Sequence, residues 1–318
     1  MAMFIFIHGT GDDDKKTENW MPWLATILEL HGHSVLVLPG VASSDAPELR
    51  RKATAFMNSL FGPPAHIVAM NPGADLGLVN AIQQAGGEIT IALAGSVAGQ
   101  EQNTIDNLCN NQRHEDGKYA TGIKLRIAVG ALCAFAHFRR RGGTVKIIGH
   151  SRGGAAAVGL HNVLSLYSIP VETLTLDPCH GVKKFVQKEY FHHVWAGTLT
   201  NIPCEQEVGD TSFEYTFRPP ITRHGTAAVT NYPKLRLIKH GHMGKLRSLA
   251  GNEIIKQAER WNMVTRLSGL TEGATQPLSV VIQLMFTVGW DSNDNSLSDK
   301  KFIAALVYYF ITNKNWRI

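Results

Sequence analysis

The chain has 318 residues, of which 44% are hydrophobic and 18% are charged, with a formal net charge of +5. This is enough apolar material for a large core, and the length allows one large domain or two smaller ones. Lysine and arginine are not interleaved with aromatic residues in a stripe, so a nucleic-acid partner is not expected. No apolar run reaches membrane-spanning length, and the N-terminus has no signal-peptide pattern. We therefore expect a soluble protein that is cytoplasmic as synthesised.

The first 122 residues predict short buried strands that alternate with helices. In chain order they predict a strand at 3–8, a helix at 20–31, a strand at 34–38, a helix at 46–61, weaker strands at 66–70 and 88–93, and a polar excursion at 102–122.

The same alternation continues through the rest of the chain. It predicts a helix at 124–141, a strand at 144–148, a helix at 155–166, strands at 171–176 and 235–238, and helices at 252–261, 276–286 and 299–312. This order predicts an α/β fold with a mostly parallel sheet and helices on both faces. In such sheets, reactive groups lie at the carboxyl ends of the strands.

The most specific motif is Gly149-His150-Ser151-Arg152-Gly153. It follows an apolar, β-branched run and precedes a run of small residues. G-x-S-x-G between a strand and a helix holds a serine in a strained turn, with its hydroxyl above the sheet. The alternative is an ordinary strand-to-helix turn. The context favours Ser151 as a nucleophile.

A serine hydroxyl needs a base, and that base needs an orienting carboxylate. Asp177 ends the strand at 171–176 and is the candidate carboxylate, unless it only caps a turn or Asp210 takes the role. His242 follows the strand at 235–238 in a glycine-flanked loop and is the candidate base. His240 is the alternative.

Two backbone N–H groups are needed to stabilise a tetrahedral oxyanion. One is expected from Arg152, directly after the serine, and the other from Gly9 or Thr10 in the loop after the first strand. A metal site is not expected, because the four cysteines have no C-x-x-C spacing and Asp12-Asp13-Asp14 is typical of a solvated acidic loop. The candidate site needs no cofactor.

Together, His8-Gly9-Thr10-Gly11, the motif at 149–154 and the order Ser–Asp–His resemble the α/β-hydrolase superfamily. Because the chain begins at the strand before the glycine loop, it is similar to small lipases that lack the first two strands of the larger fold. More narrowly, it resembles bacterial type VI secretion phospholipase effectors, through Pro39-Gly40-Val41, Ser151-Arg152-Gly153 and Leu176-Asp177-Pro178.

The resemblance implies an α/β-hydrolase-like domain over residues 1–318, with cap or insert segments at 41–122 and 179–233 and a helical C-terminal segment at 246–318. It implies a serine hydrolase that cleaves carboxylic esters, in particular those of lipids or phospholipids. Peripheral membrane contact, and export by a route without a signal peptide, are compatible with this. The same triad would serve an acyltransferase or a thioesterase, and an inactive chain with this fold would serve as a binding protein.

Overall fold

The computed structural model describes residues 2–10, 21–22, 25, 28–29, 32–41, 46–60, 100–111, 122–179, 193–203, 221–223 and 225–231. Among these residues, no helix is both long and apolar enough to cross a lipid bilayer.

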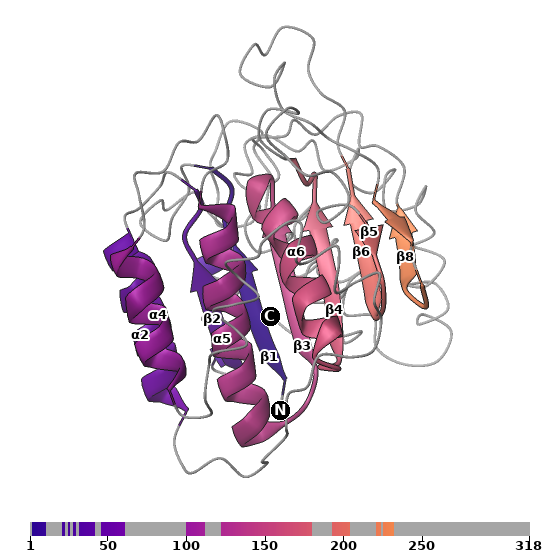
Figure 1. Ribbon diagram of the computed structural model, residues 1–318. Coiled ribbons are helices and arrows are strands. Elements are labelled where there is room, and N and C mark those ends of the chain that lie inside the picture. Colours follow the sequence, from indigo (N-terminus) through magenta and orange to yellow (C-terminus); the bar gives the residue numbers. More distant parts are fainter. Residues whose placement is uncertain are drawn as a thin grey trace, which may run out of the picture.

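The described strands form one central parallel sheet of six strands and a separate pair (Figure 1). In spatial order the central sheet contains β2 (Ser34–Leu38), β1 (Met3–Ile7), β3 (Val145–His150), β4 (Val171–Leu176), β6 (Thr198–Ile202) and β8 (Ala228–Asn231). The pair consists of β5 (His193–Val194) and β7 (Thr222–Arg223). The prediction of a mostly parallel α/β sheet is confirmed. The strands predicted at 66–70, 88–93 and 235–238 lie outside the described residues.

The direction in which the chain crosses the sheet reverses next to β1. From β1 the chain moves outward to β2, and then returns to form β3 on the other side of β1. In open α/β sheets, ligands bind outside the carboxyl ends of the strands at such a reversal point. The loops that follow β1 and β3 therefore flank the favoured position for a site.

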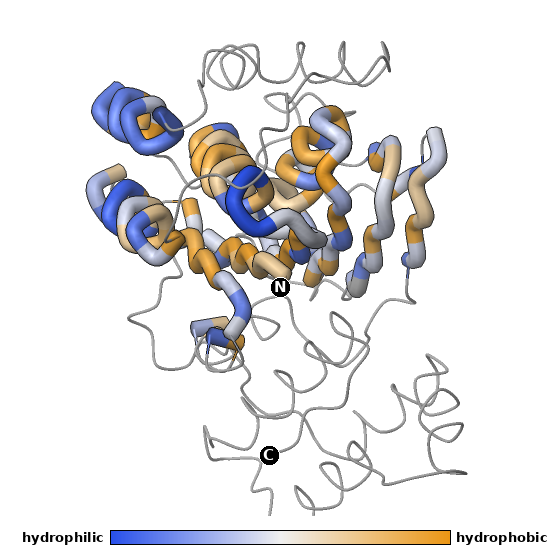
Figure 2. Tube along the Cα trace, turned by 90° about the horizontal axis from the view of Figure 1, so that it is seen from below, coloured by the Kyte–Doolittle hydropathy of each residue, from blue (hydrophilic) through white to orange (hydrophobic). Residues whose placement is uncertain are grey.

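Four described helices lie on one face of the sheet (Figures 1 and 2). They are α2 (Ala46–Ser59), α4 (Glu101–Asn110), α5 (Ile123–Arg141) and α6 (Arg152–Leu166). Helical residues between 21 and 29 are described only in part. The helices predicted at 252–261, 276–286 and 299–312 lie outside the described residues.

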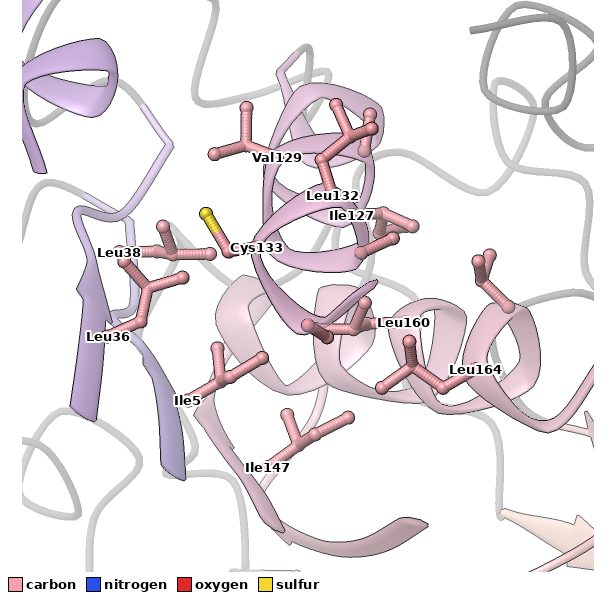
Figure 3. Close-up of a cluster of buried hydrophobic side chains, with 14 of the residues drawn as sticks. Ile5, Leu36, Leu38, Ile127, Val129, Leu132, Cys133, Ile147, Leu160 and Leu164 are labelled. Carbon is pink, nitrogen blue, oxygen red and sulfur yellow. The ribbon is translucent and has the colours of Figure 1, made fainter. Parts of the chain in front are cut away.

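The main apolar core lies between these helices and the sheet (Figure 3). Ile5 and Ile147 of the sheet point toward Leu160 of α6, and Leu38 of β2 lies beside Cys133 of α5. The alternate residues of β1 are buried too, so this strand is covered on both faces. A strand buried on both faces reads as a continuous apolar run, which explains the sequence Met-Phe-Ile-Phe-Ile.

The polar excursion expected at 102–122 is corrected in its first half, because α4 occupies Glu101–Asn110. Ile105 and Cys109 are four residues apart on this helix and both enter the core. Glu101 forms a buried ion pair with Arg139 of α5. Two apolar positions on one face, together with this ion pair, are sufficient to dock an otherwise polar helix.

The segment at 179–233, expected as a cap or insert, contributes β6 and β8 to the central sheet. β6 pairs with β4 and β8 pairs with β6, each in parallel. These strands are rich in threonine and asparagine rather than long aliphatic side chains, which is why the apolar pattern did not show them.

Candidate active site

The register of the sheet places four residues in one row at its carboxyl edge. Ile7 of β1 is level with Leu38 of β2 and with Gly149 of β3, which is itself level with Thr175 of β4. Gly9 and Gly40 follow the ends of β1 and β2 by two residues, and Ser151 and Asp177 directly follow the ends of β3 and β4. The serine, the glycine loop and the aspartate that sequence predicted as one site thus leave adjacent strands at the same level.

Ser151 has a backbone conformation that L-residues seldom adopt, with φ 56 and ψ −125. Its N–H donates to the carbonyl of Leu176, and its carbonyl accepts from the N–H groups of Gly154 and Ala155. A residue in such a region costs about 1–3 kcal/mol and persists only where its surroundings hold it. The strand-turn-helix geometry predicted for this motif is therefore present.

Positive φ angles occur at the two residues that directly follow β3 and β4. In the described part of the chain, the non-glycine residues with positive φ are Ser151, Asp177 and Ser168. Ser168 lies in the turn after α6, at the opposite end of that helix from Ser151. Strained residues cluster at functional sites, so the first two support a site at this edge.

Glycines allow the backbone segments around Ser151 to approach one another closely. A Cβ on Gly153 would lie 2.2 Å from the carbonyl oxygen of Ile7, so α6 begins against the end of β1. A Cβ on Gly9 would lie 3.2 Å from the Cβ of Ser151 and 2.8 Å from Nδ1 of His150. The β1 loop (residues 8–10) therefore lies directly against the serine, and the buried ring of His150 packs against it.

Arg152 links the serine turn to the β1 loop through its side chain. Its guanidinium donates a hydrogen bond of 2.7 Å to the hydroxyl of Thr10. Arg152 is also the first residue of α6, and the N–H groups in the first turn of a helix have no acceptor within that helix. The helix dipole places partial positive charge at the same point. Developing negative charge beside Ser151 would be stabilised by this arrangement.

Asp177 is buried at the end of β4, beside the serine turn. Thr175, two residues earlier, donates to Asn201 of β6, which in turn donates to Asn231 of β8. These side-chain bonds cross three neighbouring strands at one level and fix the carboxyl end of β4. The backbone that carries Asp177 is therefore held firmly.

Sequence reasoning missed Cys179 as a neighbour of the serine. Its sulfur lies 3.1 Å from the Ser151 hydroxyl oxygen, and its N–H donates to the Ser151 carbonyl. Cys179 follows Asp177-Pro178 directly, so its place after a strand end was the available signal. Its side chain is fully buried.

The predicted base is not among these residues, since His240 and His242 lie outside the described residues, as does Asp210. Within the described ranges, no three or more His, Cys, Asp or Glu side chains are grouped so as to hold a metal ion. Asp12, Asp13 and Asp14 also lie outside those ranges.

His161, in the middle of α6, has a structural role. One ring nitrogen is 2.8 Å from the Thr173 hydroxyl and the other is 2.5 Å from the Ala196 carbonyl oxygen. The carbonyl can only accept, so Nε2 carries the proton and Nδ1 accepts from the hydroxyl. Burial lowers the pKa of His161 to about 4, against a smaller raising effect of the Ala196 hydrogen bond. The ring is thus neutral near pH 7.

No family model matches the sequence, and no curated protein is significantly similar to it. The function proposed below therefore rests on the arrangement of residues at the carboxyl edge of the central sheet.

Proposed function

We propose that this protein is a serine hydrolase of the α/β-hydrolase superfamily that cleaves carboxylic esters, with Ser151 as its nucleophile. The observation that carries the proposal is the strained backbone of Ser151 at the start of α6, against Gly9 and hydrogen-bonded to Leu176, the residue before Asp177. Backbone strain at a serine between a buried strand and a helix is the feature that presents the hydroxyl to a substrate.

In the proposed reaction, the Ser151 oxygen forms a bond to the acyl carbon while its proton passes to the imidazole of His242. Asp177 orients that imidazole and stabilises its charged form. The tetrahedral intermediate collapses by breaking the bond to the leaving oxygen, which takes the proton from the imidazolium. Water then attacks the acyl-enzyme by the same route and releases the free acid.

The oxyanion is stabilised by the N–H of Arg152 and by one from the β1 loop. The Gly9 carbonyl faces Gly40, since a Cβ there would lie 1.7 Å from that oxygen. In a trans peptide the N–H of the next residue points the opposite way, so the Thr10 N–H is directed away from Gly40. This orientation favours Thr10 over Gly9 as the second donor.

The proposed substrates are esters of lipids, phospholipids included, at a membrane surface. This part of the proposal is supported by the resemblance of the Pro39-Gly40-Val41, Ser151-Arg152-Gly153 and Leu176-Asp177-Pro178 elements to bacterial phospholipase effectors. Release of fatty acid from phosphatidylglycerol and phosphatidylcholine vesicles, compared with hydrolysis of a short nitrophenyl ester, tests it. Turnover of the short ester alone would exclude lipid esters as the substrate class.

A fluorophosphonate probe tests the nucleophile, because it phosphonylates only an activated serine. We expect wild type to be labelled and S151A to be unlabelled. Ser168→Ala is the matched control, since Ser168 shares φ 56 but lies at the other end of α6. Labelling of S151A, or none of wild type, would overturn the proposal and leave a binding protein as the alternative.

The base is tested by the pair H242A and H240A, each serving as the control for the other. Loss of the base should lower kcat by about 10⁶-fold, on the scale seen when the histidine of a triad is removed. Equal activity of wild type and both variants would exclude the proposed base. Product analysis in the presence of an added alcohol then separates hydrolysis from acyl transfer.

A further inference from the structure

Arg126 is a buried cation in an otherwise apolar stretch of α5. Its side chain is 1% exposed, and the ten residues that follow it, 127–136, are all buried and uncharged. Burying a guanidinium costs several kcal/mol unless polar partners compensate. An aliphatic residue would fill this position at lower cost if packing alone mattered.

The partners of Arg126 include the turn that follows β2. The guanidinium donates to the carbonyl of Pro39 at 3.1 Å and to that of Gly40 at 2.9 Å. It also donates to the Gly122 carbonyl at 3.3 Å, at the start of its own helix. The planar fork of arginine suits several acceptors at fixed angles, which lysine cannot reproduce. Arg126 therefore clamps the β2 turn (residues 39–41) to α5.

The β2 turn in turn sets the position of the β1 loop. Gly40 lies so close to Gly9 that even a methyl group would overlap the Gly9 carbonyl. The N–H of His8 donates to the carbonyl of Leu38, which ties the loop to the end of β2. Gly9 then lies against Ser151 on its other side. The Gly9–Thr10 peptide is thus held between the β2 turn and the serine.

We infer that Arg126 is a positioning residue that fixes the orientation of the Gly9–Thr10 peptide through the β2 turn. Its three hydrogen bonds described above all go to backbone carbonyls, so it acts through the backbone. The inference rests on the proposed function insofar as that peptide supplies an oxyanion donor. Without the clamp, the β2 turn moves, the peptide loses its fixed orientation, and stabilisation of the transition state falls while binding of substrate is retained.

The test compares R126Q and R126K with Arg141→Gln. Arg141 is a matched control because it lies on the same helix and bonds the same strand, but at the other end, through Ser34. We expect R126Q to lower kcat for a soluble ester 10- to 100-fold, with KM changed less than twofold. Loss of one oxyanion donor lowers kcat about 10²- to 10³-fold, and a mobile donor should cost less. R126K should recover part of the loss, and R141Q should stay within twofold of wild type.

Backbone amide hydrogen exchange gives a second readout that needs no catalysis. R126Q should speed exchange of the His8 N–H at least tenfold relative to the core strands, and R141Q should not. Each variant is measured well below its thermal midpoint. If R126Q does not fold, kcat and the exchange of the His8 N–H are measured on R126K instead. Both effects should then be smaller than those expected for R126Q.

The possible outcomes distinguish failure of the proposed hydrolase function from failure of the proposed positioning role of Arg126. If wild type neither hydrolyses esters nor reacts with the fluorophosphonate, the proposed function fails, and exchange at residues 8–10 still decides whether Arg126 positions the loop. If wild type is active but R126Q keeps its kcat, or R126Q leaves loop exchange unchanged, the positioning role is overturned and the Ser151 proposal stands.

Discussion

The hydroxyl oxygen of Ser151 lies 3.1 Å from the thiol sulfur of Cys179, so two nucleophilic side chains are in contact at the carboxyl edge of the sheet. Their surroundings differ. Both are buried, but Ser151 has a strained backbone with positive φ at a helix N-terminus, whereas Cys179 does not have positive φ. Both side chains lie at the N-terminus of α6, but only the serine is held in a strained strand-to-helix turn, which is the arrangement that presents a nucleophile. The geometry therefore favours the serine as the nucleophile and the cysteine as its neighbour.

Cys179→Ala should keep most of the activity. The thiol is a weak hydrogen-bond partner, so its loss should change kcat/KM by about threefold or less, whereas S151A should abolish turnover. Steady-state hydrolysis of a soluble ester measures this. Iodoacetamide treatment of folded wild type serves as a control and should leave activity intact. Inactivation by iodoacetamide together with loss of activity in C179A would identify the cysteine as the nucleophile.

Gly40→Ala should disable the site. Its Cβ would lie 1.7 Å from the Gly9 carbonyl oxygen, and neither backbone segment can yield without moving the β1 loop. We expect kcat to fall at least a hundredfold and the free energy of unfolding to fall by about 1–3 kcal/mol, as in overpacked cores.

Gly130→Ala on α5 is the matched control for this change. There the nearest atom is a methyl group of Leu160, which can rotate away, and alanine favours a helix over glycine by about 1 kcal/mol. Its activity should equal that of wild type. Equal activity in G40A would contradict the close contact between the two loops.

Thr10→Val should weaken the site without removing a backbone donor. Valine has the shape of threonine but cannot accept the 2.7 Å hydrogen bond from Arg152. Hydrogen bonds to charged groups contribute about 1.5–3 kcal/mol, so losing this link between the β1 loop and the serine turn should lower kcat/KM about tenfold. Thr10→Ser retains the hydroxyl and should keep at least half of the activity. A T10V enzyme as active as wild type would show that the bond does not position the loop.

The sequence was sufficient to predict the elements that neighbour the serine. Continuous apolar runs predicted β1 to β4, because strands buried on both faces need such runs. The motif at 149–153 and the strand-end position of Asp177 predicted residues that directly follow the paired strands β3 and β4. These signals are local in the chain, which is why they could be found without a structure.

Local sequence patterns do not show which distant segments of the chain are in contact. A threonine- and asparagine-rich strand such as β6 is recognisable only once β4 is there to pair with it. Cys179 and Arg126 acquire their roles from the packing of loops onto strands. A buried charge near the start of an apolar stretch of helix marks Arg126 as unusual, but two of its acceptors, the carbonyls of Pro39 and Gly40, are 87 and 86 positions away in the chain.

Acid should destabilise the protein through His161. Its pKa is lowered to about 4 in the folded protein, mainly by burial, from an ordinary value of 6.5. The unfolded chain therefore binds a proton between these two values that the folded protein does not. The stability contributed by the neutral ring is fully present above pH 6.5 and is lost as the pH falls toward 4. The shift corresponds to about 3 kcal/mol.

Urea denaturation of wild type and His161→Gln between pH 7 and pH 4 measures this contribution. The variant should be less stable than wild type at pH 7, because glutamine fits the bonds to Thr173 and Ala196 less well. It should lose about 3 kcal/mol less than wild type as the pH falls. Some acid sensitivity should remain, since burial and the nearby Arg141 charge also lower the pKa of His137 to about 4. Parallel curves for wild type and H161Q would show that His161 is not held neutral in the fold.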